Sequence, residues 1–229
     1  DTLVDIQNVN TGGGNDTIWG SSSKNVIDSG SGNDIIFVIG GNDTVYAGSG
    51  ADIIYGGTDV EVINAQDGND SIVASAGADI IDGGNNIDLV DYSSSSTGIN
   101  LTLLDDGATV SVSHNIGGVS SDSLTNIEGI KGSTTASNNL VGNNLDNTLI
   151  GGDLTDIIKG VSGNNSLNGG AGNDTIFAGT GSDTIDGGAG NDDWLYYTDL
   201  ASTNVSVNLR NNTATYGSST DSITAIEHL

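Results

Sequence analysis

The sequence contains no cysteine and no methionine, and only two of its 229 residues are histidine. Without cysteine there is no disulfide framework and no thiolate metal site. Sulfur and imidazole are the ligands that favour zinc or copper, so their scarcity argues against sites for those metals. The lack of cysteine does not identify a cellular compartment, because secreted and cytosolic proteins can both avoid this residue.

Basic residues are almost as scarce. Four lysines and arginines stand against 30 aspartates and glutamates, which gives a formal net charge of −26. Nucleic acids and anionic membrane surfaces are bound by clustered basic side chains, so we expect no nucleic-acid partner. We also expect no membrane insertion, because no apolar run reaches the length of a membrane-spanning segment. Divalent cations are the natural counterpart of so many carboxylates.

Residues that fill a core are few as well. Hydrophobic residues make up 34% of the chain and aromatic residues 4%, whereas glycine supplies 36 residues. This composition favours a repeat protein or a disordered chain over an ordinary globular domain. The chain begins at Asp1 without a methionine and shows no signal-peptide pattern, so we expect it to be a piece of a longer protein.

The strongest signal is a nine-residue repeat. An acidic or amide residue, here called position six, recurs at this interval, and an apolar residue follows two places later at position eight. In a first run, position six is Asp16, Asn25, Asp34, Asp43, Asp52, Glu61, Asp70, Asp79 and Asp88. In a second run, it is Asn138, Asn147, Asp156, Asn165, Asp174, Asp183 and Asp192. Position eight is aliphatic throughout, except that Trp194 ends the second run.

This repeat predicts a parallel β-solenoid. A glycine-rich loop such as GGAGND turns tightly, and the three residues that remain form a short strand with its middle residue inward. Two repeats then make one coil of about 18 residues, and coils stack as parallel strands about 4.8 Å apart. Carboxylates repeated at that spacing repel one another unless cations lie between them. Calcium fits this role, since it takes carboxylates together with backbone carbonyls.

The repeat resembles the repeats-in-toxin (RTX), hemolysin-type calcium-binding nonapeptide over about residues 11–91 and 133–195. The resemblance implies a β-roll that binds several Ca²⁺ ions between loops two repeats apart. The implied carboxylate ligands are Asp16, Asp34, Asp43, Asp52, Asp70, Asp79, Asp88, Asp156, Asp174, Asp183 and Asp192. The implied carbonyl donors are Gly30, Gly32, Gly48, Gly50, Gly170, Gly172, Gly188 and Gly190.

Some repeats depart from the family pattern. Glu61 brings a longer side chain, for which Asp59 could substitute. Asparagine at position six lacks the charge, so we expect rungs such as Asn147 with Asn165 to be empty and held by amide ladders. In the segment 169–192, Asp174 is expected to share an ion with Asp192, while Asp183 faces the other side and meets only Asn165.

Two non-repeat segments, 92–132 and 196–229, resemble each other. Each shows apolar alternation, as in residues 99–103 and 205–209, and the sequences LDDGA and RNNTA are credible hairpin turns. We expect an all-β fold of two β-rolls, each followed by an antiparallel hairpin that caps it. The predicted domains are 1–131, with its roll at about 10–91 and its cap at 92–131, and 132–229, with its roll at 132–195 and its cap at 196–229.

No catalytic residue is predicted. The zinc-protease, nucleophile-elbow and phosphate-loop motifs are absent, and His114 and His228 are interpreted as solvated loop residues. The aromatic residues at the junctions (Tyr92, Trp194, Tyr196 and Tyr197) are interpreted as packing residues, with sugar stacking as the alternative.

The predicted function is a non-enzymatic, monomeric module that folds on calcium in a large secreted or cell-surface bacterial protein, such as an adhesin or an S-layer-like protein. The resemblance of the repeat to the RTX family implies export through a type I channel. The alternatives are the C-terminal module of an exported protease, lipase or polysaccharide epimerase, and a solenoid that binds an extracellular polysaccharide.

Overall fold

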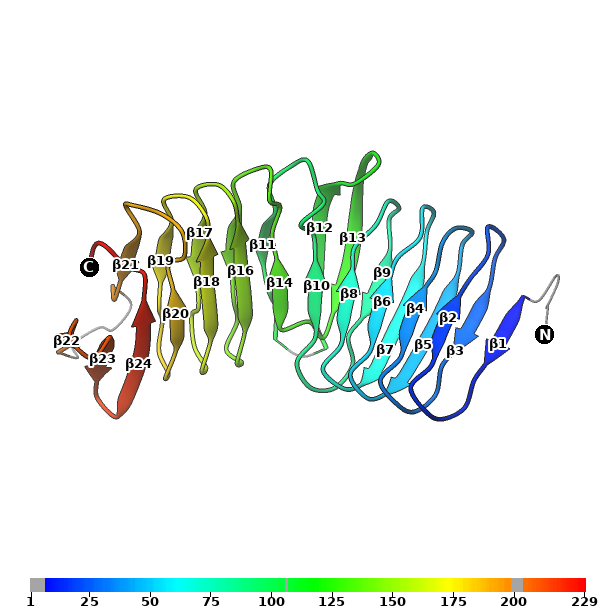
Figure 1. The fold of residues 1–229 in the computed structure, drawn as a ribbon, viewed down its shortest axis with the longest axis horizontal. Helices are drawn as coiled ribbons and strands as arrows, with labels where there is room; N and C mark the ends of the chain where they lie inside the picture. Colours follow the sequence, from blue (N-terminus) through cyan, green and yellow to red (C-terminus); the bar gives the residue numbers. More distant parts are fainter. Residues whose placement is uncertain (1–6, 106, 199–203) are drawn as a thin grey trace. The chain divides into compact units, whose positions relative to one another are not determined.

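The computed structural model describes residues 7–105, 107–198 and 204–229 (Figure 1). Every regular element in these ranges is a β-strand. No helix there is long and apolar enough to cross a membrane. The chain divides into two compact units, which combine residues 1–92 with 106–127 and residues 93–105 with 128–229. The domain boundaries expected from the sequence remain a prediction.

The first unit is a parallel β-solenoid with two sheets, whose coils are the blue and cyan strands of Figure 1. Partners lie 18 residues apart, as in Ile18 with Ile36 and Ile36 with Ile54. One sheet contains β2 (Thr17–Trp19), β4 (Ile35–Phe37), β6 (Ile53–Tyr55), β8 (Ser71–Val73) and β10 (Leu89–Asp91). The other contains β1 (Asn8–Asn10), β3 (Val26–Asp28), β5 (Thr44–Ser49), β7 (Val62–Asp67) and β9 (Ile80–Asp82), followed by β13 (Val119–Thr125) and β12 (Thr109–Asn115).

The second unit repeats this plan. One sheet contains β11 (Asn100–Thr102), β15 (Asn139–Val141), β17 (Ile157–Lys159), β19 (Thr175–Phe177) and β21 (Trp194–Tyr196). The other contains β14 (Gly129–Lys131), β16 (Thr148–Gly152), β18 (Ser166–Gly170), β20 (Thr184–Asp186) and β24 (Ser219–Thr224), followed by β23 (Thr213–Tyr216) and β22 (Ser206–Asn208). The predicted all-β fold, a solenoid with about 18 residues per coil, is confirmed in both units.

Each solenoid ends in antiparallel strands, as predicted. In the first unit β12 pairs antiparallel with β13, which continues the solenoid sheet beside β9. In the second unit β22, β23 and β24 are successive antiparallel partners, and the predicted RNNTA turn joins the first two. The interpretation of residues 99–103 as a hairpin strand is wrong, because β11 pairs parallel with β15. The predicted LDDGA turn includes residue 106, which lies outside the described residues.

Within the repeats the core consists mainly of the position-eight side chains. They are buried in both runs, at Ile18, Ile27, Ile36, Val45, Ile54, Ile63, Ile72, Ile81, Val90, Leu140, Leu149, Ile158, Leu167, Ile176 and Ile185. Their neighbours on each strand point outward, which is the alternation expected of a strand. Each buried aliphatic side chain contributes about 1.5–3 kcal/mol, so one such residue per strand makes a thin core.

Candidate metal centre

The position-six carboxylates form ladders along the solenoids. In most of them one oxygen accepts the backbone N–H of the position-six residue 18 places earlier in the chain, whereas Glu61 accepts the N–H of Gly57 in its own loop. The N–H of Asp16 donates to Oδ1 of Asp34 at 2.7 Å, and that of Asp34 donates to Oδ1 of Asp52 at 2.7 Å. In the second unit the N–H of Asp156 donates to Oδ1 of Asp174 at 2.8 Å. Each aspartate is thereby fixed beneath the start of the strand in the preceding coil.

The second oxygen of these side chains is buried and has no hydrogen-bond donor. This holds for Asp16, Asp34, Asp43, Asp52, Glu61, Asp70, Asp156, Asp174, Asp183 and Asp193. Buried polar atoms are nearly always paired, and an unpaired buried carboxylate is strongly unfavourable. A row of such atoms therefore fits a cation that the side chains share with other oxygen ligands.

Those other ligands would come from the loops. A Cβ added at Gly169 would lie 2.4 Å from Oδ2 of Asp174, and one added at Gly151 would lie 2.4 Å from Oδ2 of Asp156, so each free oxygen faces its own glycine-rich loop. Within the part of the chain that the structure describes, no three acidic or histidine side chains form a metal-binding cluster. A cation here would therefore need backbone carbonyls, as calcium commonly does.

The predicted carbonyl donors lie in these stacked loops. The carbonyl of Gly30 accepts the N–H of Ser49 at 2.8 Å, and that of Gly170 accepts the N–H of Ala189 at 2.6 Å. A carbonyl oxygen has two lone pairs, so each can also face a cation. The ligand roles of these carbonyls, and of Gly32, Gly48, Gly50, Gly172, Gly188 and Gly190, remain predictions.

Burial makes several of these carboxyl groups hard to ionise. Burial, opposed by the hydrogen bond from a backbone N–H and reinforced by a carboxylate one coil away, raises the pKa of Asp52 and of Asp70 to about 6 and that of Asp174 to about 7. Burial, followed by the charge of Asp79, raises the pKa of Glu61 to about 8. A cation beside these groups would favour the charged form and oppose this effect.

A pH dependence follows for the cation-free chain. The pKa of an unfolded aspartate is about 4, so between about pH 4 and 7 the folded state binds protons that the unfolded state has released. We therefore expect the cation-free fold to lose stability as pH rises across this window. Circular dichroism in calcium-depleted buffers should show more β-structure at pH 5 than at pH 7.5. The opposite trend would contradict the burial of these carboxyl groups.

At the end of the second run the register shifts by one residue. The N–H of Asp174 donates to Oδ1 of Asp193 at 2.7 Å, and Leu195, not Trp194, is the buried residue of β21. The Asp192 side chain is 53% exposed, and its Oδ1 lies 2.8 Å from Nε2 of His228. The prediction that Asp192 forms the rung with Asp174 is thus wrong in register. The sequence held the signal, because Asp193 is followed two places later by leucine.

The ladders end on residues of the hairpin segments, which the sequence reasoning missed. The N–H of Asp79 donates to Oδ1 of Asp122 and that of Asp183 donates to Oδ1 of Asp221, both at 2.9 Å. The expectation that Asp183 meets only Asn165 is therefore wrong. The available signal was the pair of similar sequences DSLTNIEGI and DSITAIEHL, which begin with these two aspartates.

The two terminal aspartates differ from most of the other aspartate rungs because protein groups reach both of their oxygens, as they also do at Asp79. Tyr92 donates its hydroxyl to Oδ2 of Asp122 at 2.9 Å, and His114 Nε2 lies 3.1 Å from Oδ1. In the second unit Tyr197 donates to Oδ2 of Asp221 at 2.9 Å. His114 is 1% exposed within β12, so its interpretation as a solvated loop residue is wrong.

Replacing Tyr92 by phenylalanine tests this arrangement. The variant leaves Oδ2 of Asp122 buried without its donor, so we expect a loss of about 1–3 kcal/mol in the free energy of unfolding. Urea unfolding in excess calcium measures it. Tyr46→Phe is the control, since Tyr46 is 41% exposed on the same unit. Equal stability of the two variants would contradict the role of Tyr92.

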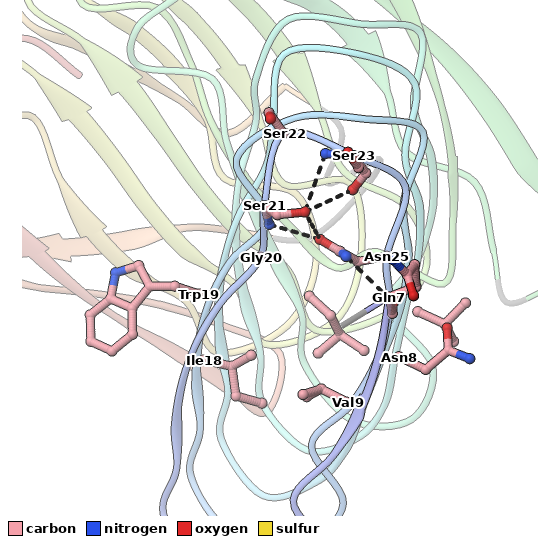
Figure 2. Close-up of a pocket in the computed structure, with 12 residues that line it drawn as sticks. Gln7, Asn8, Val9, Ile18, Trp19, Gly20, Ser21, Ser22, Ser23 and Asn25 are labelled. Atoms are coloured by element: carbon pink, nitrogen blue, oxygen red, sulfur yellow. Dashed lines mark hydrogen bonds between the residues drawn. The ribbon is translucent and has the colours of Figure 1, made fainter. Parts of the chain in front are cut away.

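A cavity at the β1–β2 end of the first unit has a different character. Its volume is about 450 Å³, and the 12 lining residues include no acidic side chain (Figure 2). There Oδ1 of Asn25 accepts the N–H of Ser21 at 2.7 Å, while Trp19 points away from the enclosed space. This cavity is therefore no candidate for the calcium site that the carboxylate ladders define.

A parallel β-solenoid with a buried, half-satisfied carboxylate in successive coils defines a class of cation-binding repeat. The profile of the RTX calcium-binding nonapeptide repeat family matches the chain at residues 6–36, 40–60, 55–90 and 159–193, about half of its length. The chain belongs to this family, as its nine-residue repeat predicted.

Other comparisons add less. No curated protein matches the chain. Among solved structures, the extracellular lipase LipA from Serratia marcescens matches with 16% sequence identity and a TM-score of 0.37. The match covers 89% of this chain and 43% of that chain, so this chain spans less than half of the lipase's length.

Proposed function

We propose that this chain binds several calcium ions between its position-six carboxylates and folds around them. The observation that carries this proposal is the row of buried carboxylate oxygens without donors. In the first unit the ions would lie at the rungs formed by Asp16, Asp34, Asp52 and Asp70. In the second unit they would lie at those formed by Asp156, Asp174 and Asp193.

Bound calcium would neutralise carboxylates whose burial otherwise opposes folding. The chain's own groups prepare the site: backbone N–H groups fix one oxygen of each aspartate, and the glycine loops bring main-chain carbonyls near the other. At tenfold excess over its dissociation constant, each ion adds about 1.4 kcal/mol of stability. About six ions would then contribute on the order of 8 kcal/mol, which is comparable with the whole stability of a domain.

Far-UV circular dichroism tests the proposal. We expect a largely unfolded spectrum in excess EGTA and a β-spectrum after calcium is added, with a midpoint of about 10⁻⁴ to 10⁻³ M. Magnesium at the same concentration is the control, because its small ion demands near-octahedral geometry and dehydrates reluctantly. A complete β-spectrum in chelator would overturn the proposal.

Calcium-dependent folding suits a module of a large secreted or cell-surface protein, which would stay unfolded at low calcium and fold outside the cell. The net charge of −26 and the one buried aliphatic residue per strand support this assignment. An adhesin or S-layer-like parent is the proposed setting, and a type I-secreted enzyme is the alternative. Refolding the chain at submicromolar and at millimolar calcium tests the setting: folding at both concentrations would contradict it.

A further inference from the structure

We propose that asparagine at position six makes a rung independent of calcium. The hydrogens of its amide NH₂ bind the loop carbonyls, a role that a cation would have at an aspartate rung. The proposal rests on the proposed calcium binding of the aspartate rungs. Its clearest case is Asn165 in the second unit, which is 2% exposed. This residue type would then encode, coil by coil, which rungs need an ion.

All the hydrogen-bonding groups of the Asn165 side chain are used. Its Oδ1 accepts the N–H of Asn147 at 2.9 Å, as the aspartates do in their ladders. Its Nδ2 donates to the carbonyls of Ser162 and Gly163, both at 3.2 Å. The reversed amide would set its oxygen against two carbonyl oxygens, so the contacts fix the orientation.

The amide nitrogen occupies the place of the unpartnered carboxylate oxygen. A Cβ added at Gly160 would lie 2.9 Å from Nδ2 of Asn165, just as one at Gly169 would lie 2.4 Å from Oδ2 of Asp174. In both loops the same added atom would meet a carbonyl oxygen of the next coil at 2.3 Å. The two loops therefore share one arrangement, with a double donor in one and an acceptor without a donor in the other.

The chemistry of the loop explains the exchange. In the Asn165 loop the carbonyl oxygens of Ser162 and Gly163 face this place, and they need a positively charged or hydrogen-donating neighbour. The NH₂ group supplies two hydrogens to them in the Asn165 loop. In the Asp174 loop the same place holds a carboxylate oxygen without a donor, whose charge a cation would neutralise.

Asn138 shows the same use of the amide. Its Nδ2 donates to the carbonyl of Ser133 at 3.0 Å and to Oδ1 of Asp156 at 2.9 Å. Its Oδ1 accepts the N–H groups of Ile99 and Ser133, each at 2.9 Å. The asparagine thus satisfies its own loop without an ion and also donates to one oxygen of Asp156, whose other oxygen has no donor.

The test is the substitution Asn165→Asp in the full chain. The variant replaces the double donor with a carboxylate oxygen that faces two carbonyls, so we expect it to bind one more calcium ion per chain than the wild type. Native mass spectrometry and isothermal titration with calcium alone would count the ions. Asn164→Asp is the matched control: it adds the same charge at the adjacent, exposed residue, and its calcium count should not change.

The reciprocal substitution Asp174→Asn should bind at least one ion fewer and still show the β-spectrum in saturating calcium. An unchanged count in Asn165→Asp, with a wild type that binds calcium, would overturn this inference alone. A wild type that binds no calcium would instead overturn the proposed function. A rise in the Asn164→Asp control equal to that of Asn165→Asp would show that added charge, not the loop, binds the ion, and would also overturn the inference.

Discussion

Replacing Gly48 by alanine is expected to destabilise the first solenoid strongly. Gly48 has φ +110°, and a Cβ there would lie 1.7 Å from the carbonyl oxygen of Gly30 in the preceding coil. The clash is with main chain, so it can be relieved only if the two loops separate and the Ser49-to-Gly30 hydrogen bond breaks. We expect a loss of more than about 4 kcal/mol, which is exceptional for one substitution.

The matched control is Gly12→Ala. Gly12 also has a positive φ, of +86°, but no atom lies within 4 Å of its added Cβ. This variant carries only the strain of the left-handed conformation, about 1–2 kcal/mol. Calcium titrations followed by circular dichroism should show a large upward shift of the folding midpoint for Gly48→Ala and a small one for Gly12→Ala. Equal shifts would mean that loop stacking is looser than the structure shows.

The second large effect is expected from Asp193→Ala. Asp193 is fully buried, and its Oδ1 accepts the N–H of Asp174, while its own N–H donates to Oε2 of Glu227 at 3.0 Å. The substitution leaves a buried N–H without an acceptor, at a cost of about 1–3 kcal/mol. It also removes a proposed ligand, and each tenfold loss of calcium affinity at that site removes about 1.4 kcal/mol more.

The neighbouring Asp192→Ala is an internal control, since it removes the same charge one residue away. The Asp192 side chain bonds only at the surface, to Trp194 and His228, so we expect a change below about 1 kcal/mol. Calcium counting should show at least one ion fewer for Asp193→Ala and no change for Asp192→Ala. The reverse result would mean that Asp192, and not Asp193, is the calcium ligand, as the uninterrupted nine-residue register predicts.

The solenoid was predictable because each of its coils is encoded by the same nine-residue repeat. Each coil obeys the same demands, an aliphatic residue inward and glycine where loops touch, so the period alone gave the strands and the carboxylate ladder. The register failed at Asp192 because one inserted residue moves every later side chain to the opposite face. Comparing Trp194 with Leu195 as the inward residue would have revealed the shift, since tryptophan is far larger than the aliphatic residues at the other position-eight sites.

The non-repeat segments were harder, for physical reasons. Alternation at residues 99–103 reports only that one face is buried, and it cannot distinguish a hairpin strand from a solenoid strand. The burial of His114 depends on Asp122, which belongs to another strand and terminates a ladder formed by distant coils. Contacts of this kind come from tertiary packing, so a single sequence does not display them.

The carboxylate ladders also give the solenoid a direction of assembly. Each rung satisfies the N–H of the coil before it, so a coil is complete only when the next coil along the chain has joined. Growth of this kind has no internal stop, because every new coil presents another unsatisfied N–H. Asp122, Asp221 and Glu227 end the series by accepting the N–H groups of Asp79, Asp183 and Asp193 from strands or segments outside the repeats. The hairpin segments thus end the directional stacking of coils by satisfying the last N–H groups of the ladders.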